Sequence, residues 1–567
     1  ALYLQSLTDA EQPGIHTRRI DGSGRATDEA LLAHYSKQIE RLGGRADGHW
    51  EFAVCVATGR GQIFERTIVS PRTFVDKPSQ QVIPGYPLES IQIEPESGMY
   101  ISEMSPDEQD AFWQKTIGKE LCAFIQEVQA QILPGSMAHV EKITMTSSLD
   151  TFTLAPGFRA AATACGLKPS GNLDLALIAA DRPCVAAGVF TTNRVKAAPV
   201  LYDQKILEQN PNGIRAIIAN AGCANACTGP RGMDDTRKMA ALAAYGLRCQ
   251  PDEVLVLSTG VIGRRLDMDK LTRGIADITA PGAQQGAPFA ARAILTTDTR
   301  PKVAARRVAI GDVQFTISGF CKGAGMIHPN MATMLAIITT DAVIAPAPLQ
   351  AALRAAVARS FNRVSVDGDM STNDTVLLLA SGASGVEITT ENVERAENDN
   401  VYSSSSVISA AAAVIFTQAL TELCVDLAKQ IARDGEGATR LVEITVSGAL
   451  DEAQAHVVAD SIARSPLVKT AIHGGDPNWG RVLCAAGYSG AALDPDRLAL
   501  AFGADGDQVR VVAHGLPAEY DERTAAATLR GDTVYVNLDL GLGDARATVW
   551  TCDLTAEYVA INAHYTT

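Results

Sequence analysis

Residues 322–342, KGAGMIHPNMATMLAIITTDA, have the clearest potential for chemistry in this sequence. They read as a glycine-rich loop and a His-Pro-Asn turn, followed by an apolar β-strand that starts at Met331. Thr333 places a hydroxyl at the mouth of that strand, and a hydroxyl acts as a nucleophile once a neighbouring base takes its proton. Threonine is also common in strands for steric reasons alone, so its residue type leaves both interpretations open.

Several widespread catalytic signatures do not occur in the sequence, which has no G-x-S-x-G elbow, H-E-x-x-H pair, P-loop or paired C-x-x-C motif. Cys223 and Cys227 in CANAC have a spacing that suits a metal, but no further cysteine or histidine is near them in sequence. Buried thiols are the better interpretation. GFCKGAG, residues 319–325, lacks the context of a dinucleotide site. We therefore expect no metal site and no resident cofactor.

Alternating β-like and α-like stretches must position the reactive segment. Short apolar runs at 216–218 and 254–257 predict strands, and the apolar period of 346–359 and 410–432 predicts helices. Residues 534–540 and 548–551 flank GLGDAR and predict a hairpin. This alternation indicates an α/β fold class and leaves its topology open.

The composition changes near residue 135. Residues 1–133 hold aromatic pairs such as His49–Trp50 and Phe112–Trp113, whereas the sequence beyond residue 154 is rich in Ala, Gly and Val. A Pro-Gly turn and small polar residues between them predict a linker. The predicted organisation is a domain at 1–133, a linker at 134–149, and two further regions at 150–332 and 333–567.

Within the first domain, residues 51–59 and 61–69 predict two strands joined by a Gly-Arg-Gly turn. Ser105 and Pro106 open a predicted helix, as N-cap and first helical residue. Its apolar residues recur at three- and four-residue steps and predict a core-facing stripe: Phe112, Trp113, Ile117, Leu121, Phe124, Ile125 and Val128.

Charge and length exclude some classes of function. The 567 residues include 49 Lys+Arg and 64 Asp+Glu, a net charge of −15, and no basic run that would neutralise a phosphate backbone. We therefore expect neither nucleic acid nor anionic membrane as a partner. No apolar stretch is long enough to span a bilayer, and the first residues do not resemble a signal peptide. Eleven scattered cysteines fit a reducing compartment, so we expect a cytoplasmic protein.

A series of motifs from about residue 150 to the C-terminus resembles the ornithine acetyltransferase family of arginine biosynthesis, whose members are glutamate N-acetyltransferases and, in part, amino-acid acetyltransferases. The motifs occur in the family's order: DLALI (174–178), GVFTTN (188–193), ANAGCANACTG (219–229), STGVIG (258–263), TTDT (296–299), DGDMSTND (367–374), DGEGATR (434–440), GGDPNWGR (474–481) and the terminal INAHYTT. So many ordered matches are far more specific than one short pattern.

The resemblance implies a fold and a reaction. The expected fold is an α/β sandwich with a second C-terminal α/β lobe. Proteins similar to this one cut themselves between the residues that correspond to Ala332 and Thr333, which would give an α chain ending at 332 and a β chain of 333–567. The new N-terminal Thr333, with its own amine as a base, would take acetyl from N-acetylornithine and pass it to glutamate in a ping-pong reaction. Some relatives also use acetyl-CoA, and the sequence leaves that open.

The resemblance also assigns roles to individual residues. The Thr259 hydroxyl and the Gly260 N–H would form the oxyanion hole. The implied substrate-binding residues are Thr296, Lys322, Thr333, Glu436, Asn562 and Thr567. A lysine and a glutamate are the charges needed to hold small amino acids by their carboxylate and ammonium groups. Relatives assemble as dimers of such α–β heterodimers.

Residues 1–133 resemble the later part of the inosine-triphosphate (non-canonical purine NTP) pyrophosphatase family. The resemblance rests on residues 13–35, 52–57 and 84–109. The family's phosphate- and metal-binding stretch has no counterpart here, PGYPLES at 84–90 lacks the family's Asp, and Trp113-Gln114-Lys115 replaces its S-H-R. We therefore expect an incomplete α+β domain with a scaffolding or regulatory role.

Two other hypotheses remain open at this point. A self-processed N-terminal-threonine enzyme of the same architecture would be an aminopeptidase or amidase if water, and not glutamate, accepted the acyl group. A third hypothesis makes the chain a non-catalytic interaction protein.

Overall fold

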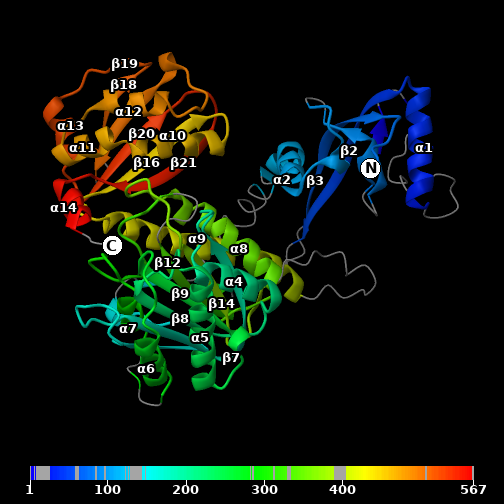
Figure 1. The fold of residues 1–567 in the computed structure, drawn as a ribbon. Helices are drawn as coiled ribbons and strands as arrows, with labels where there is room; N and C mark the ends of the chain where they lie inside the picture. Colours follow the sequence, from blue (N-terminus) through cyan, green and yellow to red (C-terminus); the bar gives the residue numbers. More distant parts are fainter. Residues whose placement is uncertain are drawn as a thin grey trace. The chain divides into compact units, whose positions relative to one another are not determined.

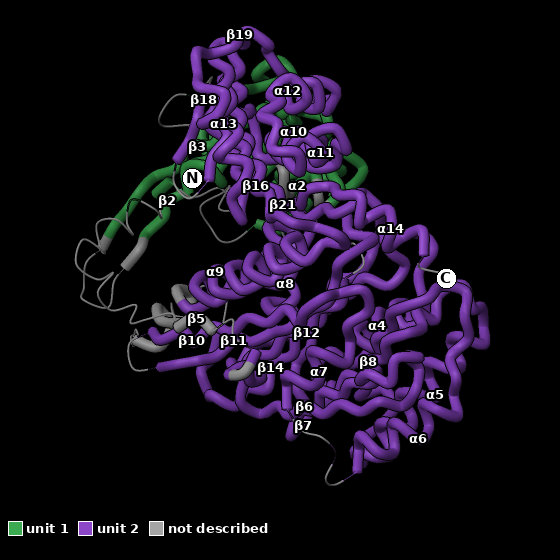
Figure 2. The backbone as a smooth tube through the Cα atoms, turned by 90° about the vertical axis from the view of Figure 1, so that its left-hand side faces the viewer, with its two compact units in different colours: residues 1–139 green, residues 140–567 purple. Residues whose placement is uncertain are grey.

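The computed structural model of the chain describes residues 2–4, 7, 26–57, 63–82, 86–94, 97–121, 123–124, 127, 144–146, 149–280, 283, 286–310, 313–328, 334–388, 404–504 and 507–564. The chain forms two compact units, residues 1–139 and 140–567 (Figure 2).

The first unit contains an antiparallel sheet with the order β1-β2-β3-β4. β1 (Leu2–Leu4), β2 (Arg45–Ala57), β3 (Ile63–Val75) and β4 (Gln92–Ile93) are covered by α1 (Asp28–Arg41), whose Leu31, Tyr35 and Ile39 belong to the same core. β2 and β3 pair antiparallel up to Ala57 and Ile63, which confirms the predicted pair of strands, and both strands extend further from the turn than predicted. The predicted Gly-Arg-Gly turn lies outside the described residues.

The predicted helix of this unit is present but changes its winding. α2 (Pro106–Trp113) starts after Ser105, whose N–H donates to the Glu108 carboxylate at 2.8 Å. Residues Gln114–Gly118 then form a π-turn. Arg72 stacks on the rings of Phe112 and Trp113 at 4.7 and 5.2 Å and donates to Thr116, and these contacts accompany the wider turn. Ile125 and Val128 of the predicted stripe lie outside the described residues.

The second unit begins with a nine-stranded β system in which β7 (Leu175–Phe190) is shared by two sheets. One half of β7 pairs with β6 (Phe158–Thr163) and β8 (Ile214–Cys223), and β9 (Val254–Val261) follows β8. The other half pairs with β14 (Thr375–Ala380). Beyond β14 lie β12 (Leu335–Thr340), β11 (Val313–Lys322), β10 (Lys302–Ile310) and β5 (Thr144–Thr146).

The two sheets pack face to face, and helices cover both outer faces (Figure 1). Along β12, Leu335 and Ile337 belong to the core between the sheets, whereas Ala336 and Ile338 belong to the core under α8 (Pro346–Ala358) and α9 (Ser404–Arg433). Strands buried on both faces read as continuous apolar runs, and this explains why short runs located β8 and β9 in the sequence.

Helices α5 (Gly229–Leu247) and α6 (Met268–Thr279) cover the opposite outer face. The remaining helices of the sandwich are α4 (Ala198–Gln209) and α7 (Ala287–Ala293), and β13 (Val343–Ile344) pairs with β15 (Glu387–Ile388). The predicted helices at 346–359 and 410–432 are confirmed as α8 and α9. The result is a four-layer α/β/β/α sandwich, and the predicted α/β sandwich is correct.

A C-terminal lobe follows the sandwich, with the strand order β19-β18-β17-β20-β16-β21. Its strands are β16 (Leu441–Ala449), β17 (Ala499–Ala504), β18 (Asp507–Ala513), β19 (Leu516–Pro517), β20 (Thr533–Asp539) and β21 (Ala545–Cys552). Its helices are α10 (Glu452–Arg464), α11 (Pro466–Gly474), α12 (Trp479–Gly487), α13 (Glu522–Thr528) and α14 (Ala556–His564). This is the predicted second α/β lobe.

Three expectations need correction or restatement here. β20 and β21 do not form a hairpin, because β16 lies between them, parallel to β20 and antiparallel to β21. Cys223 is buried as expected, but Cys227 is exposed; it follows the buried Ala224, Asn225 and Ala226 and has a left-handed backbone conformation. Within the predicted linker, β5 pairs with β10.

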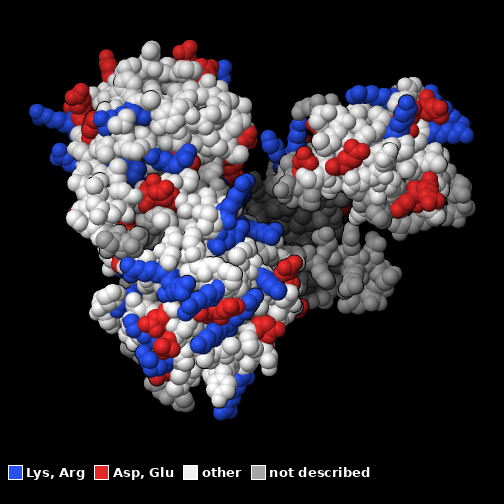
Figure 3. All heavy atoms as spheres, in the orientation of Figure 1, with Lys and Arg blue, Asp and Glu red and all other residues white. Residues whose placement is uncertain are grey.

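Among the helices in the described ranges, none combines the length and the apolar composition that a membrane crossing requires. On the face drawn in Figure 3, Lys and Arg side chains lie among Asp and Glu side chains over the sandwich.

Candidate active site

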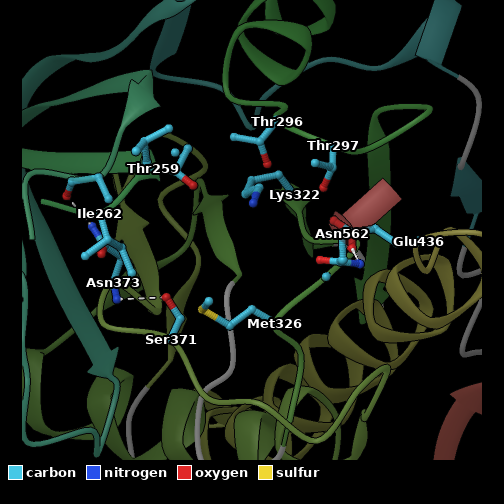
Figure 4. A pocket seen from close by; sticks show the side chains of 14 residues that line it. Thr259, Ile262, Thr296, Thr297, Lys322, Met326, Ser371, Asn373, Glu436 and Asn562 are labelled. Atoms are coloured by element: carbon cyan, nitrogen blue, oxygen red, sulfur yellow. Dashed lines mark hydrogen bonds between the residues drawn. The ribbon is translucent and has the colours of Figure 1, made fainter. Parts of the chain in front are cut away.

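A cavity of about 240 Å³ lies in the second unit, and every predicted site residue that the structure describes lines it (Figure 4). These residues come from segments far apart in the sequence: Thr259 and Gly260, Thr296, Lys322, Glu436 and Asn562. Ala332 and Thr333 lie outside the described residues, as does Thr567. The volume suits a small metabolite.

Gly260 forms one wall where β9 ends. Its φ of +126° lies in the region that favours glycine. A Cβ at this position would lie 2.4 Å from the Gly222 carbonyl carbon and 2.6 Å from the Cys223 nitrogen. The β8 and β9 backbones therefore meet here too closely for any side chain, and the backbone of STGVIG faces the cavity beside the buried Thr259.

Asn373, in the DGDMSTND segment, forms hydrogen bonds to the backbone of this wall. Its amide donates to the carbonyls of Ala224 at 2.6 Å and Ser258 at 2.8 Å, and its own N–H donates to the Ser371 hydroxyl at 3.1 Å. Asn373 and Ser371 both line the cavity (Figure 4). The sequence marked this segment as a motif without indicating which of its residues reach the site.

Lys322, the last residue of β11, extends its ammonium into the cavity (Figure 4). The side chain is buried, and in the described ranges its ammonium has no hydrogen-bonding partner. Burial lowers the pKa of Lys322, although Asp298 works against that shift. A buried cation with free donors can bind a ligand carboxylate.

A buried ion network holds the surrounding loops together. The Lys302 ammonium donates to Asp298 Oδ1 and to Asp434 Oδ2, both at 2.6 Å. Asp298 Oδ1 also accepts the Gly323 N–H at 2.6 Å. The network joins TTDT, the glycine loop after β11 and DGEGATR, which carry Thr296, Lys322 and Glu436, so it positions three predicted site residues at once.

The charged groups of this network shift one another's pKa values. Burial by itself would raise the pKa of Asp298, but the Lys302 and Lys322 ammonium groups outweigh burial and hold that pKa well below its usual range. Burial would likewise lower the pKa of Lys302, but Asp298 and Asp434 raise it. Asp298 and Lys302 are therefore charged at neutral pH.

Lys302→Met is expected to lower the free energy of unfolding by about 3–5 kcal/mol, because two buried carboxylates lose the ammonium group that bonds both of them. The wild-type contribution of Asp298 is complete above its unfolded pKa and disappears as the pH falls through its lower folded pKa. Urea unfolding at neutral pH measures the loss. Arg237→Met, which breaks the exposed pair with Asp234, is the control and should cost about 1 kcal/mol or less. Equal unfolding midpoints for the two variants would contradict the role of the network.

Glu436 lies on the opposite side of the cavity, where the C-terminal helix joins the site. Asn562, on α14, donates to Glu436 Oε2 at 2.8 Å (Figure 4). A Cβ on Gly325 would lie 2.4 Å from the Glu436 carboxyl carbon, so a glycine is required for this carboxylate to approach the loop. The two predicted residues therefore act as a pair.

Asp374 is a residue that the sequence did not single out. Its Oδ1 accepts the Met334 N–H at 2.9 Å, and its Oδ2 has no hydrogen-bonding partner among the described residues. Burial raises the pKa of Asp374 well above its ordinary value, more than the Met334 hydrogen bond and Lys322 lower it. A buried carboxyl group whose pKa is raised thus lies beside Met334, the residue bonded to Thr333. Asp374 stands directly before the apolar run of β14, and this position is a sequence signal for a residue at the start of a strand.

The fold is a layered α/β sandwich. Its loops bring a buried lysine, a glutamate and a tight glycine turn to one cavity. These features define the class of protein as an enzyme with a small-molecule site. The chain belongs to the ArgJ family, whose family model matches residues 159–567.

Relatives agree with this assignment. The chain is 47% identical over 430 residues to the arginine biosynthesis bifunctional protein ArgJ of Dehalococcoides mccartyi, covering 75% of this chain and 100% of that protein. It is 47% identical to the Geobacter sulfurreducens protein of the same name, covering 72% of this chain and 99% of that one. The crystal structure of ornithine acetyltransferase complexed with ornithine from Mycobacterium tuberculosis is 42% identical, with a TM-score of 0.30, and the match covers 33% of this chain and 98% of that one.

The resemblance found in the sequence is thereby confirmed for the second unit, and the chain is an acetyltransferase of arginine biosynthesis. This outcome favours the first functional hypothesis over the aminopeptidase or amidase and over the non-catalytic protein. The pyrophosphatase resemblance lies outside the matched residues and stays a prediction.

Proposed function

We propose that the chain cuts itself between Ala332 and Thr333 and then moves acetyl from N-acetylornithine to glutamate through an ester on Thr333. The observation that carries this proposal is the convergence of Thr259, Gly260, Lys322 and Glu436 on one cavity. Arginine biosynthesis in the names of the relatives and ornithine in the solved complex support the choice of substrate.

In the cut, the Thr333 hydroxyl oxygen attacks the Ala332 carbonyl carbon. The C–N bond then breaks, and the nitrogen keeps its electrons and gains a proton as the Thr333 amine. Water hydrolyses the resulting ester and releases the Ala332 carboxylate. The Asp374 carboxyl holds the Met334 N–H at 2.9 Å, which fixes the chain one residue after the nucleophile.

In acetyl transfer, the Thr333 hydroxyl attacks the acetyl carbonyl of the donor, and the ornithine amine leaves with a proton. Glutamate's amine then attacks the acetyl ester and regenerates the hydroxyl. Both tetrahedral intermediates carry an oxyanion, and we assign its stabilisation to the Thr259 hydroxyl and the Gly260 N–H. Losing one such donor typically costs about 10²–10³ in turnover.

Substrate recognition follows from the charges in the cavity. Lys322 binds the substrate carboxylate, and Glu436, oriented by Asn562, binds the ammonium group. Thr296 adds a hydroxyl beside Lys322 (Figure 4). We assign Thr567 to the same substrate contact on the strength of the family motif.

The proposal is tested with the purified protein in a denaturing gel and an acetyl-transfer assay. We expect two bands, with N-terminal sequencing of the second reading TMLAII, and glutamate-dependent release of ornithine from N-acetylornithine. A single uncut chain, or release of acetate that does not depend on glutamate, would overturn it.

Lys322→Met is expected to raise the KM for glutamate by about tenfold or more, because a charge-assisted hydrogen bond contributes about 1.5–3 kcal/mol. Since burial lowers the pKa of Lys322, the wild-type KM should rise with pH before an ordinary lysine would titrate. Initial rates from neutral to alkaline pH measure both effects. The exposed Lys205→Met is the control. A variant that keeps the same alkaline rise in KM would refute the role of Lys322.

The remaining expectations are also proposals. We propose that catalysis needs no metal or resident cofactor, that the α and β chains stay together as a dimer of heterodimers, and that the protein works in the cytoplasm. Adding acetyl-CoA as the sole donor tests whether it serves as a second donor, and light scattering of the cut protein tests its assembly.

A further inference from the structure

Asp367 holds the loop after β11 through both oxygens of its carboxyl group. Oδ1 accepts the Ile327 N–H at 2.8 Å, and Oδ2 accepts the Met326 N–H at 2.6 Å. The Val366 N–H donates to the Ile327 carbonyl at 2.8 Å, and the Tyr558 hydroxyl on α14 donates to Oδ2 of Asp367 at 3.4 Å. Met326 lines the active-site cavity (Figure 4), but the family resemblance assigned no role to Asp367.

Asp374 makes the equivalent contact on the other side of the proposed cut. Its Oδ1 accepts the Met334 N–H at 2.9 Å, and the Thr375 N–H donates to the Met334 carbonyl at 3.1 Å. At each end, therefore, a carboxyl group accepts the N–H of one residue, and the backbone N–H next to that aspartate donates to the carbonyl of the same residue. Residues 328–333, which include both residues of the proposed cut, lie between these two double contacts in the sequence.

The two contacts keep one register. Both join residues 40 positions apart, and the parallel pairing of β12 with β14 continues that offset from Leu335 and Thr375. The stretches 328–333 and 368–373 therefore span equal lengths of sequence between the same two contacts. Residues 367–374 thus form a bracket, with an aspartate at each end, for the interval that contains the proposed cut.

A bracket of this kind matters for a bond that the chain cuts by itself. The attacking hydroxyl of Thr333 and the carbonyl of Ala332 must approach each other in the correct geometry, and a misplacement of about 1 Å can cost about a hundredfold in rate. Contacts on both sides of the bond restrict the conformations of the chain between them. They therefore raise the share of molecules in which the hydroxyl can reach the carbonyl.

The two ends of the bracket have different tasks once the bond is cut. Asp367 then bonds Ile327, which belongs to the α chain, so it no longer holds a residue covalently joined to the nucleophile. Asp374 still bonds Met334, which remains attached to Thr333. Acetyl transfer therefore depends on the second contact and not on the first.

We propose that Asp367 is a positioning residue for the cut, and that Asp374 is a positioning residue for both the cut and acetyl transfer. The proposal rests on the Thr333 chemistry proposed above and adds the contacts that hold the bond in place. Asp367 fixes the chain before the bond, and Asp374 fixes the chain after it.

The rate of cutting is measured on the full chain made by cell-free translation, pulse-labelled and followed on a denaturing gel. Asp367→Asn puts an NH₂ group where an oxygen accepted a backbone N–H, so it should slow cutting by about tenfold or more and leave kcat per cut chain within about twofold of the wild-type value. The criterion is kcat and not KM, because Met326 lines the substrate cavity.

Asp374→Ala should slow both cutting and kcat per cut chain by about tenfold or more. Asp374→Asn is the conservative variant. It keeps the single oxygen that accepts the Met334 N–H, so it should restore most of both rates. Asp367→Asn cannot restore its contacts in this way, because both oxygens of Asp367 accept backbone N–H groups.

Asp341→Asn is the matched control, at the opposite end of β12. Asp341 is also buried, its Oδ1 accepts the Thr316 N–H at 2.6 Å, and burial raises its pKa as it raises that of Asp367. This variant should be cut at the wild-type rate. If Asp367→Asn does not fold, as judged by circular dichroism, Tyr558→Phe removes the hydroxyl that bonds Asp367 Oδ2 and should slow cutting about threefold.

Cutting of Asp367→Asn, or in its place of folded Tyr558→Phe, at the wild-type rate would overturn the proposal. So would an equal loss of cutting in Asp341→Asn, a kcat per cut chain that falls together with the rate of cutting in Asp367→Asn, or an Asp374→Asn variant as slow as Asp374→Ala. A wild-type chain that stays uncut would refute the Thr333 chemistry itself, and the proposal with it, so the two failures are distinguishable.

Discussion

Replacing Thr333 with alanine is expected to leave one uncut chain of 567 residues and to slow acetyl transfer by about a thousandfold or more. Both effects have one cause, since the same hydroxyl attacks Ala332 in the cut and the acetyl group in the transfer. β12 begins at Leu335, and Asp374 holds the Met334 N–H at 2.9 Å. The chain next to the nucleophile therefore stays ordered in the variant. A denaturing gel and the transfer assay measure the two effects on one preparation.

Two controls separate this chemistry from general damage. Thr333→Ser keeps a hydroxyl and a future N-terminal amine, so it should still be cut and should retain part of the activity. Thr470→Ala removes an exposed threonine hydroxyl from α11 and should change neither property. Cutting of Thr333→Ala at the same bond would show that another group is the nucleophile.

Gly260→Ala is expected to lower kcat by about 10²–10³, the typical effect of losing an oxyanion donor. The new Cβ would lie 2.4 Å from the Gly222 carbonyl carbon, and the residue would keep a φ of +126° that disfavours alanine. The β8 and β9 backbones must therefore separate, which moves the Gly260 N–H away from the cavity. Steady-state kinetics measure kcat, and the extent of cutting reports on the same donor in the first reaction.

Gly263→Ala is the matched control, because it lies in the same loop with a φ of +79° and no atom within 4 Å of its new Cβ. It incurs the backbone strain of about 1–3 kcal/mol without the collision. Its unfolding midpoint should fall while kcat stays near the wild-type value. An equal loss of kcat in both variants would show that loop strain, and not the close approach at Gly260, controls turnover.

Much of the fold was predictable because the sandwich strands are buried on both faces. Apolar runs at 216–218 and 254–257 correspond to β8 and β9, and helical periodicity located α8 and α9. Strand pairing was not predictable in the C-terminal lobe. GLGDAR suggested a hairpin, but β16, almost a hundred residues earlier, pairs with both flanking strands. Local sequence specifies a strand more firmly than it specifies the partner of that strand.

The candidate site was also predictable only in part. The motifs indicated Thr259, Gly260, Thr296, Lys322, Glu436 and Asn562, and the structure brings these together. They did not indicate the Lys302 network, in which the hydrogen bond to Asp434 joins residues 132 positions apart. They contained Asp374 but did not indicate that its Oδ2 has no hydrogen-bonding partner among the described residues. Such groups reveal their role only when the fold has removed water from around them.

The central claim is tested most directly by mass spectrometry. The protein is incubated with N-acetylornithine in the absence of glutamate, the reaction is quenched, and the mass of each chain is measured. We predict that the chain beginning at Thr333 carries one added acetyl group on the Thr333 hydroxyl, and that adding glutamate removes it as N-acetylglutamate. An uncut chain, or an acetyl group attached at another residue and transferred from there, would contradict Thr333 as the nucleophile.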